Sequence, residues 1–293
     1  MNNTKINAKL MVKIYLAQKS EITEFHVYSR LAKSMKGKNK KILQKIANEE
    51  NSHAEFWKRY SQKDIKPSQW KIFKFFWIAK ILGFTFAIKL MEKGEEVAQI
   101  NYEEMSKDIP EARKLVDEEE EHEKQLIELL NEERLDYIGS IVLGLNDALV
   151  ELTGALAGFT LAFQNTHIIA LAGLITGIAA SFSMASSEYL SNKADGQEAE
   201  KAFKAAIYTG IAYILTVILL VLPFFLVHNY LICMGLTLLI AILIILFFNL
   251  YVSIAKDVPF RKRFLEMVTI SMGVAGFSFF VGYLIRVVFG IDI

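Results

Sequence analysis

The sequence contains a single cysteine, Cys233, in 293 residues. One cysteine can form neither an internal disulfide nor a thiolate metal cluster, so any metal site in this chain must be built from Glu, Asp, His or Met. The sequence also lacks Val/Ile/Thr-rich runs that alternate with period two, so β-strands are not expected. A net charge of +1 gives no indication of a nucleic-acid partner. The expected fold class is therefore all-α.

Charged residues are scarce in the second part of the chain. Residues 1–135 carry 25 Lys or Arg and 22 Asp or Glu, whereas residues 136–293 carry only 8 and 10. The first twenty residues also lack an uninterrupted apolar stretch of signal-peptide length, so we expect no cleaved targeting segment. This split predicts two domains, a water-soluble one over residues 1–135 and a membrane-embedded one over residues 136–293.

Five apolar stretches follow one another in the second domain, at about 138–163, 168–190, 205–227, 230–254 and 265–289. Each is long enough for the ~20 residues that a helix needs to cross a bilayer. The connections 164–167 and 227–230 contain no Lys or Arg, whereas 191–204 contains three and 255–264 contains four. By the positive-inside rule, the second pair of connections and the first domain are expected in the cytoplasm, and the C-terminus outside.

Two of the expected spans carry carboxylates, which are unfavourable in a bilayer and usually mark an ion or proton path. Asp147 and Glu151 lie four residues apart in the first span, and Met184 and Glu188 lie four apart in the second. Because a thioether is a soft ligand that suits transition metals, these residues together predict a path for Fe²⁺ or Mn²⁺. The same carboxylates could take up protons when the ion leaves. The alternatives are structural polar contacts between helices, a position of Glu188 at the membrane interface and, for Met184, ordinary packing.

Small residues recur in the same two spans. The sequences GALAG (154–158) and GLITG (173–177) fit the Gly-x-x-x-Gly pattern. This pattern lets two helix backbones approach closely, so we expect close helix contacts within the bundle or across a dimer.

The first domain is expected to be helical. Residues 5–60 and 83–133 have few helix breakers. Gly37 separates the first helix from the second, and Pro110 lies at a helix start, where its missing N–H is harmless. Four helices in two antiparallel hairpins are the simplest arrangement.

The segment between these helices, residues 67–86, is rich in aromatic side chains. It also contains Lys71, Lys74 and Lys80, and this density of lysine argues against a spanning helix. A helix that lies on the membrane surface fits the pattern, with aromatics dipped into the bilayer and lysines reaching back to water. Burial against the bundle or a dimer partner is the alternative.

Two Glu-x-x-His pairs occur in the first domain at matching positions. One pair lies in EENSHAEF (49–56) and the other in EEEEHEKQ (118–125), so both members are shifted by the same offset. A further glutamate precedes each pair, and the offset between these two is nearly the same. One Glu from each of two helices plus Glu-x-x-His from each of two others is the ligand set of dinuclear iron sites in four-helix bundles. The candidate ligands are Glu21, Glu50, His53, Glu92, Glu119 and His122.

The acidic run before His122 offers two glutamates at helical spacing, Glu118 and Glu119. Glu119 is the expected ligand, because its spacing to the histidine repeats that of the first pair. The other acidic residues of the run are expected to form a solvated face. Tyr28 and Tyr102 could orient ligands through hydrogen bonds, but core packing is the expected role of both.

These motifs resemble two known families. Residues 1–133 resemble the rubrerythrin branch of the ferritin-like superfamily through EITEFHVYSRLA, EENSH, KLMEKGEE and EEEEHE. Residues 136–293 resemble the vacuolar iron transporter family through IVLGLNDALVELTGALAG and GIAASFSMASSEYLS. The combination is similar to the membrane-bound ferritins, which are prokaryotic proteins that export iron from the cell.

The resemblance implies a cytoplasmic ferritin-like four-helix bundle that holds two iron ions, with Glu95 as an extra ligand. It implies a transport site at Asp147 and Met184, with Glu188 in the matching acidic position. It also implies a homodimer in a prokaryotic cell membrane, an ion path along the subunit interface, and Fe²⁺/H⁺ antiport. The expected function is export of Fe²⁺, or of Mn²⁺, with an N-terminal domain that captures, oxidises or senses iron.

An enzyme is the main alternative, in the form of a membrane-anchored ferroxidase or peroxidase whose spans only hold it in place. Carboxylates inside the spans argue against it, because they are costly in a bilayer and a helix that only anchors the protein does not need them. Rubrerythrins that reduce peroxide also carry a four-cysteine iron domain, which a chain with one cysteine lacks. A metal sensor or storage module that acts on a partner is the third class.

Overall fold

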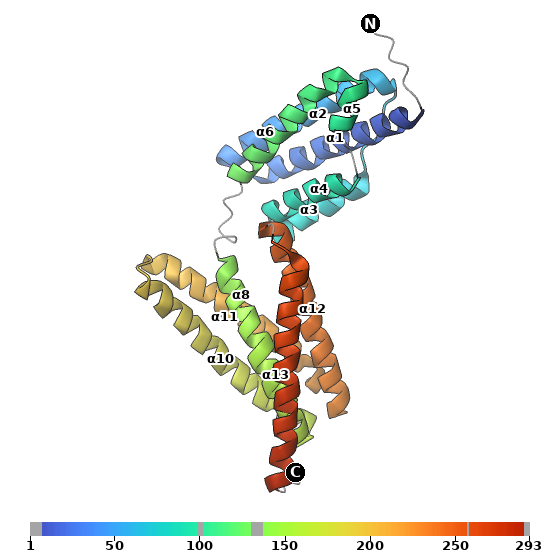
Figure 1. Cartoon of the computed structure of the whole chain (residues 1–293). Coiled ribbons are helices and arrows are strands. Elements are labelled where there is room, and N and C mark those ends of the chain that lie inside the picture. The colour runs from blue at the N-terminus through green and yellow to red at the C-terminus, as the bar shows by residue number, and fades with distance from the viewer. Residues whose placement is uncertain (1–7, 99–101, 130–136, 257, 290–293) are drawn as a thin grey trace. The chain divides into compact units, whose positions relative to one another are not determined.

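A computed structural model describes residues 8–98, 102–129, 137–256 and 258–289, apart from the side chains of residues 92, 94–98, 103, 120, 123–129 and 289. Every regular element over these ranges is helical, which confirms the all-α prediction (Figure 1). The chain divides into two compact units, Met1–Glu132 and Glu133–Ile293.

The N-terminal unit begins with an antiparallel helical hairpin (Figure 1). Helix α1 spans Ala8–Ser34 and helix α2 spans Gly37–Ser61. Gly37 has a φ of 66°, a left-handed conformation that glycine adopts without steric strain. The chain therefore reverses direction over the two residues between the helices.

Shorter helices complete the N-terminal unit. Helices α3 (Gln69–Leu82) and α4 (Phe84–Ala98) pack together and are joined at Gly83, which has a φ of 101°. Helix α5 (Tyr102–Asp108), the 3₁₀ turn η1 (Pro110–Ala112) and helix α6 (Arg113–Leu129) follow. The second half of the unit is thus more divided than the long helices expected from the sequence, and its ferritin-like arrangement stays a prediction.

Two apolar clusters lie at different heights along the α1–α2 hairpin. One joins α1, α2, α3 and α4 and includes Leu31 and Ile46. The other joins α1, α2, α5 and α6 and includes Ile14 and Trp57. Buried polar side chains, which include Glu21 in α1 and Glu50 in α2, occupy the stretch of both helices between these clusters. A polar layer is therefore enclosed between two apolar ones.

Within its described residues, the second unit, which we call the membrane unit, contains five helices that are long and apolar enough to cross a membrane, as the sequence predicts. They are Ile138–Phe163, α10 (Thr166–Ala194), α11 (Ala199–Leu226), α12 (Tyr230–Lys256) and α13 (Phe260–Phe289). Leu171, Ile175 and Phe277 are each more than half exposed. Such an apolar exterior suits contact with lipid, since extended apolar surface in water is unfavourable.

The first spanning helix changes its winding near its middle. Helices α8 (Ile138–Asp147) and α9 (Thr153–Phe163) are joined by a π-helical turn, η2 (Ala148–Leu152). A π turn contains one residue more than an α-helical turn, which redirects the side chains around it, and such turns are frequent at functional sites.

Glycines bring neighbouring spans into close contact. A Cβ atom built on Gly282 in α13 would lie 2.3 Å from the carbonyl oxygen of Gly158 in α9. A Cβ atom on Gly177 in α10 would lie 2.6 Å from a methyl group of Val217 in α11. Both Gly-x-x-x-Gly patterns therefore lie at helix contacts inside this unit.

The substitution Gly282→Ala is expected to destabilise the membrane unit. The added methyl group would overlap a backbone oxygen, and relieving such an overlap in a packed interior costs about 1–3 kcal/mol. Gly276→Ala in the same helix is the matched control, because nothing lies within 4 Å of its added carbon. Helix propensity alone makes the control neutral or more stable by up to about 1 kcal/mol.

The unfolding midpoints of the two variants are measured by thermal unfolding of the detergent-solubilised protein, with the reactivity of Cys233 as the signal. It is the chain's only cysteine and is buried, so a fluorogenic maleimide reacts with it only as the membrane unit opens. Equal unfolding midpoints for the two variants would contradict the close approach of α9 and α13.

Candidate metal centre and intramembrane carboxylates

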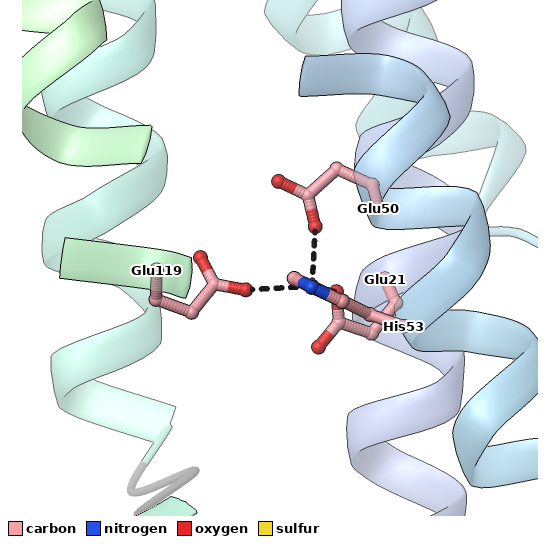
Figure 2. Close-up of side chains that lie close together, drawn as sticks. All are labelled: Glu21, Glu50, His53 and Glu119. Atoms are coloured by element: carbon pink, nitrogen blue, oxygen red, sulfur yellow. Dashed lines mark hydrogen bonds and ion pairs between the residues drawn. The ribbon is translucent and has the colours of Figure 1, made fainter. Parts of the chain in front are cut away.

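Four side chains converge in the polar layer of the N-terminal unit (Figure 2). Helix α1 contributes Glu21, α2 contributes Glu50 and His53, and Glu119 reaches them from α6. One ligand atom from each residue lies within 4.8 Å of all the others. Glu21, Glu50 and His53 are almost completely buried, and Glu119 is half-buried. The group therefore has the donor types, the convergence and the burial of a metal site.

More carboxylate oxygens surround His53 Nδ1 than the one hydrogen on this nitrogen can satisfy. Its Nδ1 atom lies 3.1 Å from Glu119 Oε1, 3.5 Å from Glu21 Oε2 and 3.6 Å from Glu50 Oε2. A ring nitrogen carries at most one hydrogen and so cannot satisfy three carboxylates. Glu21 Oε2 and Glu50 Oε2 are buried without a hydrogen bond. Because buried anionic oxygens are costly when unpaired, a bound cation would stabilise this arrangement.

His122 extends the group toward a second position. Its ring stacks beside that of His53, with centroids 5.6 Å apart. His122 Nδ1 lies 3.3 Å from Glu50 Oε1 and 3.8 Å from Glu119 Oε2. Glu50 and Glu119 each direct one oxygen toward each histidine. Two carboxylates arranged in this way can bridge two metal ions, with the imidazoles as terminal ligands.

Two glutamates that the sequence analysis did not select hold the outer nitrogens of the histidines. Glu118 Oε2 lies 3.0 Å from His53 Nε2, and Glu49 Oε2 lies 2.9 Å from His122 Nε2. Each glutamate thus pairs with the histidine of the other helix. With Nε2 donating to these carboxylates, Nδ1 of each ring is left to face the converging oxygens.

The interpretation of Glu118 as part of a solvated face is therefore incomplete, since one of its oxygens binds a buried ring. A sequence signal for both outer glutamates existed. Glu49 and Glu118 each lie four residues before a histidine, so the offset between them equals the offset between the two histidines.

The two tyrosines considered as orienting residues differ in role. Tyr28 is buried in the apolar cluster shared by the first four helices, as expected. The Tyr102 hydroxyl instead donates a hydrogen bond to Glu21 Oε1, and its ring stacks on Trp57. Packing alone therefore does not describe Tyr102, because its hydroxyl fixes one oxygen of a converging carboxylate.

Protonation in this layer is governed by burial and by the crowding of carboxylates. Burial alone would lower the pKa of His122, but the nearby carboxylates of Glu119 and Glu50 outweigh it and raise the pKa to about 10. The pKa of His53 is likewise raised despite its burial. Burial raises the pKa of Glu21. At Glu50, burial is outweighed by the nearby imidazoles of His122 and His53, which lower the pKa to about 2.

Two of the expected ligands cannot be compared with this geometry. Glu92 and Glu95 lie on helix α4, but their side chains are outside the described residues. The convergence described above rests on helices α1, α2 and α6 only. His26 follows Glu21 by five residues, which places it off the helix face of that ligand, and it is exposed.

The carboxylates of the first span lie at its π-helical turn. Asp147 ends α8 and is half-buried, while Glu151 lies within η2 and is exposed. The hydroxyl of Tyr213, a fully buried residue of α11, lies 3.4 Å from Glu151 Oε2 and donates a hydrogen bond to it. The change in winding thus occurs where the sequence placed the candidate ion path.

The candidate residues of the second span lie on α10. Ser140 in α8 donates a 2.6 Å hydrogen bond to Glu188 Oε1, which ties this carboxylate to the first span. Met184 is half-buried and packs against the apolar core of the membrane unit. Its position is therefore consistent with the packing alternative as well as with a ligand role.

In metal-free protein, the stability of the N-terminal unit is expected to fall as the pH rises above 7. The pKa of folded His122, about 10, exceeds the ordinary value of 6.5, so its contribution is complete below pH 6.5 and is lost as the pH approaches 10. The raised pKa of Glu21 acts in the same direction. The expected loss in unfolding free energy is roughly 2 kcal/mol between about pH 7 and pH 9.

Denaturant unfolding of the full chain with a chelator, followed by tryptophan fluorescence, tests this expectation. All three tryptophans, Trp57, Trp70 and Trp77, lie in the N-terminal unit and report on it alone. His122→Gln is expected to reduce the pH dependence, because it removes one of the groups with a raised pKa, while the exposed His26→Gln control keeps it in full. A wild-type midpoint that does not change with pH would refute the crowded arrangement.

Comparison with known protein families gives a match in the membrane unit. Residues 138–202 match the VIT family, a range that includes Asp147, Glu151, Met184 and Glu188. No curated protein and no solved structure matches the chain. The resemblance of residues 1–133 to rubrerythrins lies outside the matched range and stays a prediction. With its five candidate spans, the chain is an integral membrane protein that carries a VIT family domain at residues 138–202.

Proposed function

We propose that this chain exports Fe²⁺, with Mn²⁺ as a second cargo, from the cytoplasm by proton antiport. The observation that carries the proposal is the VIT family match over two spans, the first of which carries Asp147 and Glu151 at a π-helical turn. Carboxylates are kept inside a bilayer mainly where they serve ions or protons. The family name and the intramembrane chemistry thus point to the same class of function, membrane transport of a divalent transition metal.

The ion path would run past Asp147, Glu151, Met184 and Glu188. Carboxylate oxygens attract a divalent ion, and the thioether favours a transition metal over Mg²⁺ or Ca²⁺. Tyr213 and Ser140 each hold one oxygen of a carboxylate by a hydrogen bond and leave the other to the ion. When the ion leaves, protons can neutralise these side chains, which would couple export of metal to import of protons.

The N-terminal unit would capture the cargo before transport. Glu50 and Glu119, each shared between two histidines, fit the bridging ligands of a two-iron centre, with Glu21 beside His53. Such a centre supplies binding of Fe²⁺ and a route to its oxidation. Glu49, Glu118 and Tyr102 keep the ligand atoms oriented, and the apolar layers exclude water.

The direction of transport follows from the distribution of basic residues. The connections around 191–204 and 255–264 carry the Lys and Arg residues, which favours a cytoplasmic position for them and for the N-terminal unit. A capture site on that side suits an exporter. A homodimer, with the path along the interface between its subunits, is part of the proposal.

The variant Asp147→Asn is expected to reduce Fe²⁺ flux in proteoliposomes under a pH gradient by roughly tenfold or more, because it removes a charge that draws the ion into the bilayer. Glu200→Gln is the matched control, since Glu200 is an exposed residue at the start of α11 that pairs with Lys204. Flux in Asp147→Asn equal to that of the control would sink the assigned path.

A membrane-anchored ferroxidase is the second candidate. The burial of the converging Glu and His side chains favours it. Glu50→Gln is expected to weaken Fe²⁺ binding by the full-length protein at least tenfold, because it removes charge from a carboxylate shared by two histidines. Glu55→Gln, an exposed position on the same helix, is the control. Calorimetric titration under anaerobic conditions measures both variants.

Flux measurements separate the candidates. An exporter with a capture domain carries Fe²⁺ in proteoliposomes, and Glu50→Gln lowers flux at limiting Fe²⁺. A ferroxidase oxidises Fe²⁺ and carries none. Binding without flux or oxidation would instead indicate a sensor or storage module. Unchanged Fe²⁺ binding in Glu50→Gln would contradict the metal centre itself.

A further inference from the structure

Helix α3 exposes an apolar stripe on the surface of the N-terminal unit. Trp70 is 71% exposed, Phe73 50%, Trp77 45% and Ile81 65%. Their spacing of three, four and four residues places them on one face of the helix. The rings contact each other along this face, with centroids 6.4 Å apart for Trp70 and Phe73 and 6.2 Å apart for Phe73 and Trp77.

The opposite face of α3 is firmly packed. Ile72, Phe75 and Ala79 are buried in the apolar cluster that joins the first four helices. The N-cap residue Ser68 accepts a hydrogen bond from the Lys71 N–H and also donates its own N–H to Thr23 of α1. The exposed stripe therefore belongs to a helix that is fixed in the unit, so it forms a stable surface.

The charge around the stripe has one sign. Residues 65–91 contain five lysines and neither Asp nor Glu. Lys74 Nζ lies 4.7 Å from the centre of the Phe75 ring, and Lys80 Nζ lies 5.2 Å from that of Phe76. Lys80 is exposed and Lys74 is partly exposed, so both side chains lie at the surface beside these rings. This combination fits a surface that is apolar within and anionic at its edge.

The chain itself keeps the N-terminal unit near a bilayer. Helix α6 ends at Leu129 and the first candidate span begins at Ile138. The eight intervening residues reach at most about 30 Å when fully extended. A lipid surface is therefore always within reach of the N-terminal unit, at a high effective concentration.

We propose that α3 docks on the bilayer that holds the spans, with its stripe at the boundary between headgroups and acyl chains. Tryptophan side chains favour this boundary, where an apolar ring can sit beside a polar surface. The lysines then contact anionic lipid headgroups. Docking through α3 gives the N-terminal unit a fixed orientation on the membrane, and it does not depend on the metal chemistry proposed above.

Full-length protein in nanodiscs of anionic lipids with brominated acyl chains tests the proposal, because bromine quenches tryptophan only at short range. Brominated lipid is expected to reduce the emission by about half relative to unbrominated lipid. The double variant Trp70→Phe/Trp77→Phe keeps the apolar stripe and leaves only the buried Trp57, so its emission is expected to be nearly unchanged. Wild-type emission without quenching would overturn the proposal.

The lysines are tested by changing three of them to Gln, at positions 71, 74 and 80. The quenching in anionic nanodiscs is expected to fall at least twofold, and quenching of the wild type is expected to fall similarly in zwitterionic nanodiscs. The control changes three exposed lysines of α2, at positions 38, 40 and 41, and keeps the wild-type quenching. Equal loss in both triple variants would overturn the assigned contact.

A second copy of the chain is the competing occupant of the stripe. Burial between two copies would leave both exposed tryptophans unquenched by brominated lipid, and it would allow disulfide cross-linking of Phe73→Cys between chains in a Cys233→Ser background. That pair of results would overturn the membrane assignment. Quenching without cross-linking supports it.

Discussion

Several buried carboxylates share one imidazole nitrogen in the N-terminal unit, and the rest of that unit is arranged around this excess of negative charge. Glu21 and Glu50 each bury an oxygen that has no hydrogen bond. Desolvated anionic oxygens are costly, so they persist only where a proton or a cation compensates them. The apolar clusters above and below exclude water, and Glu49 and Glu118 prevent the rings from turning their second nitrogen inward.

The membrane unit meets a related constraint in a different medium. Lipid offers no hydrogen bonds, so the candidate spans are helical and only the short connections between them are not. Glycines bring the helices together, and the π turn presents Asp147 and Glu151 near the middle of a span. The two candidate sites differ in character. The first is closed by buried imidazoles, which suits retention, whereas the second combines incompletely buried carboxylates with a thioether, which suits exchange of the ion.

Sequence periodicity accounts for much of this arrangement. The five spans follow from the length and apolarity of their segments, since bilayer thickness fixes both. The pairing of Glu50 with His53, and of Glu119 with His122, follows from helical geometry, because residues three apart share a face. The recurrence of this spacing at one common offset indicated that the two pairs would act together, although a linear pattern carries no distance between helices.

By itself, the sequence therefore determined the helical class, the membrane segments and which residues could be ligands, because these depend on local period and composition. Only the tertiary structure decided that Glu118 contacts His53 rather than His122 of its own helix, that Tyr102 binds Glu21, and that one face of α3 is left exposed. Each of these depends on the packing of helices that are distant in sequence. Contacts between such helices are set by the shape of the whole core, which no local pattern encodes.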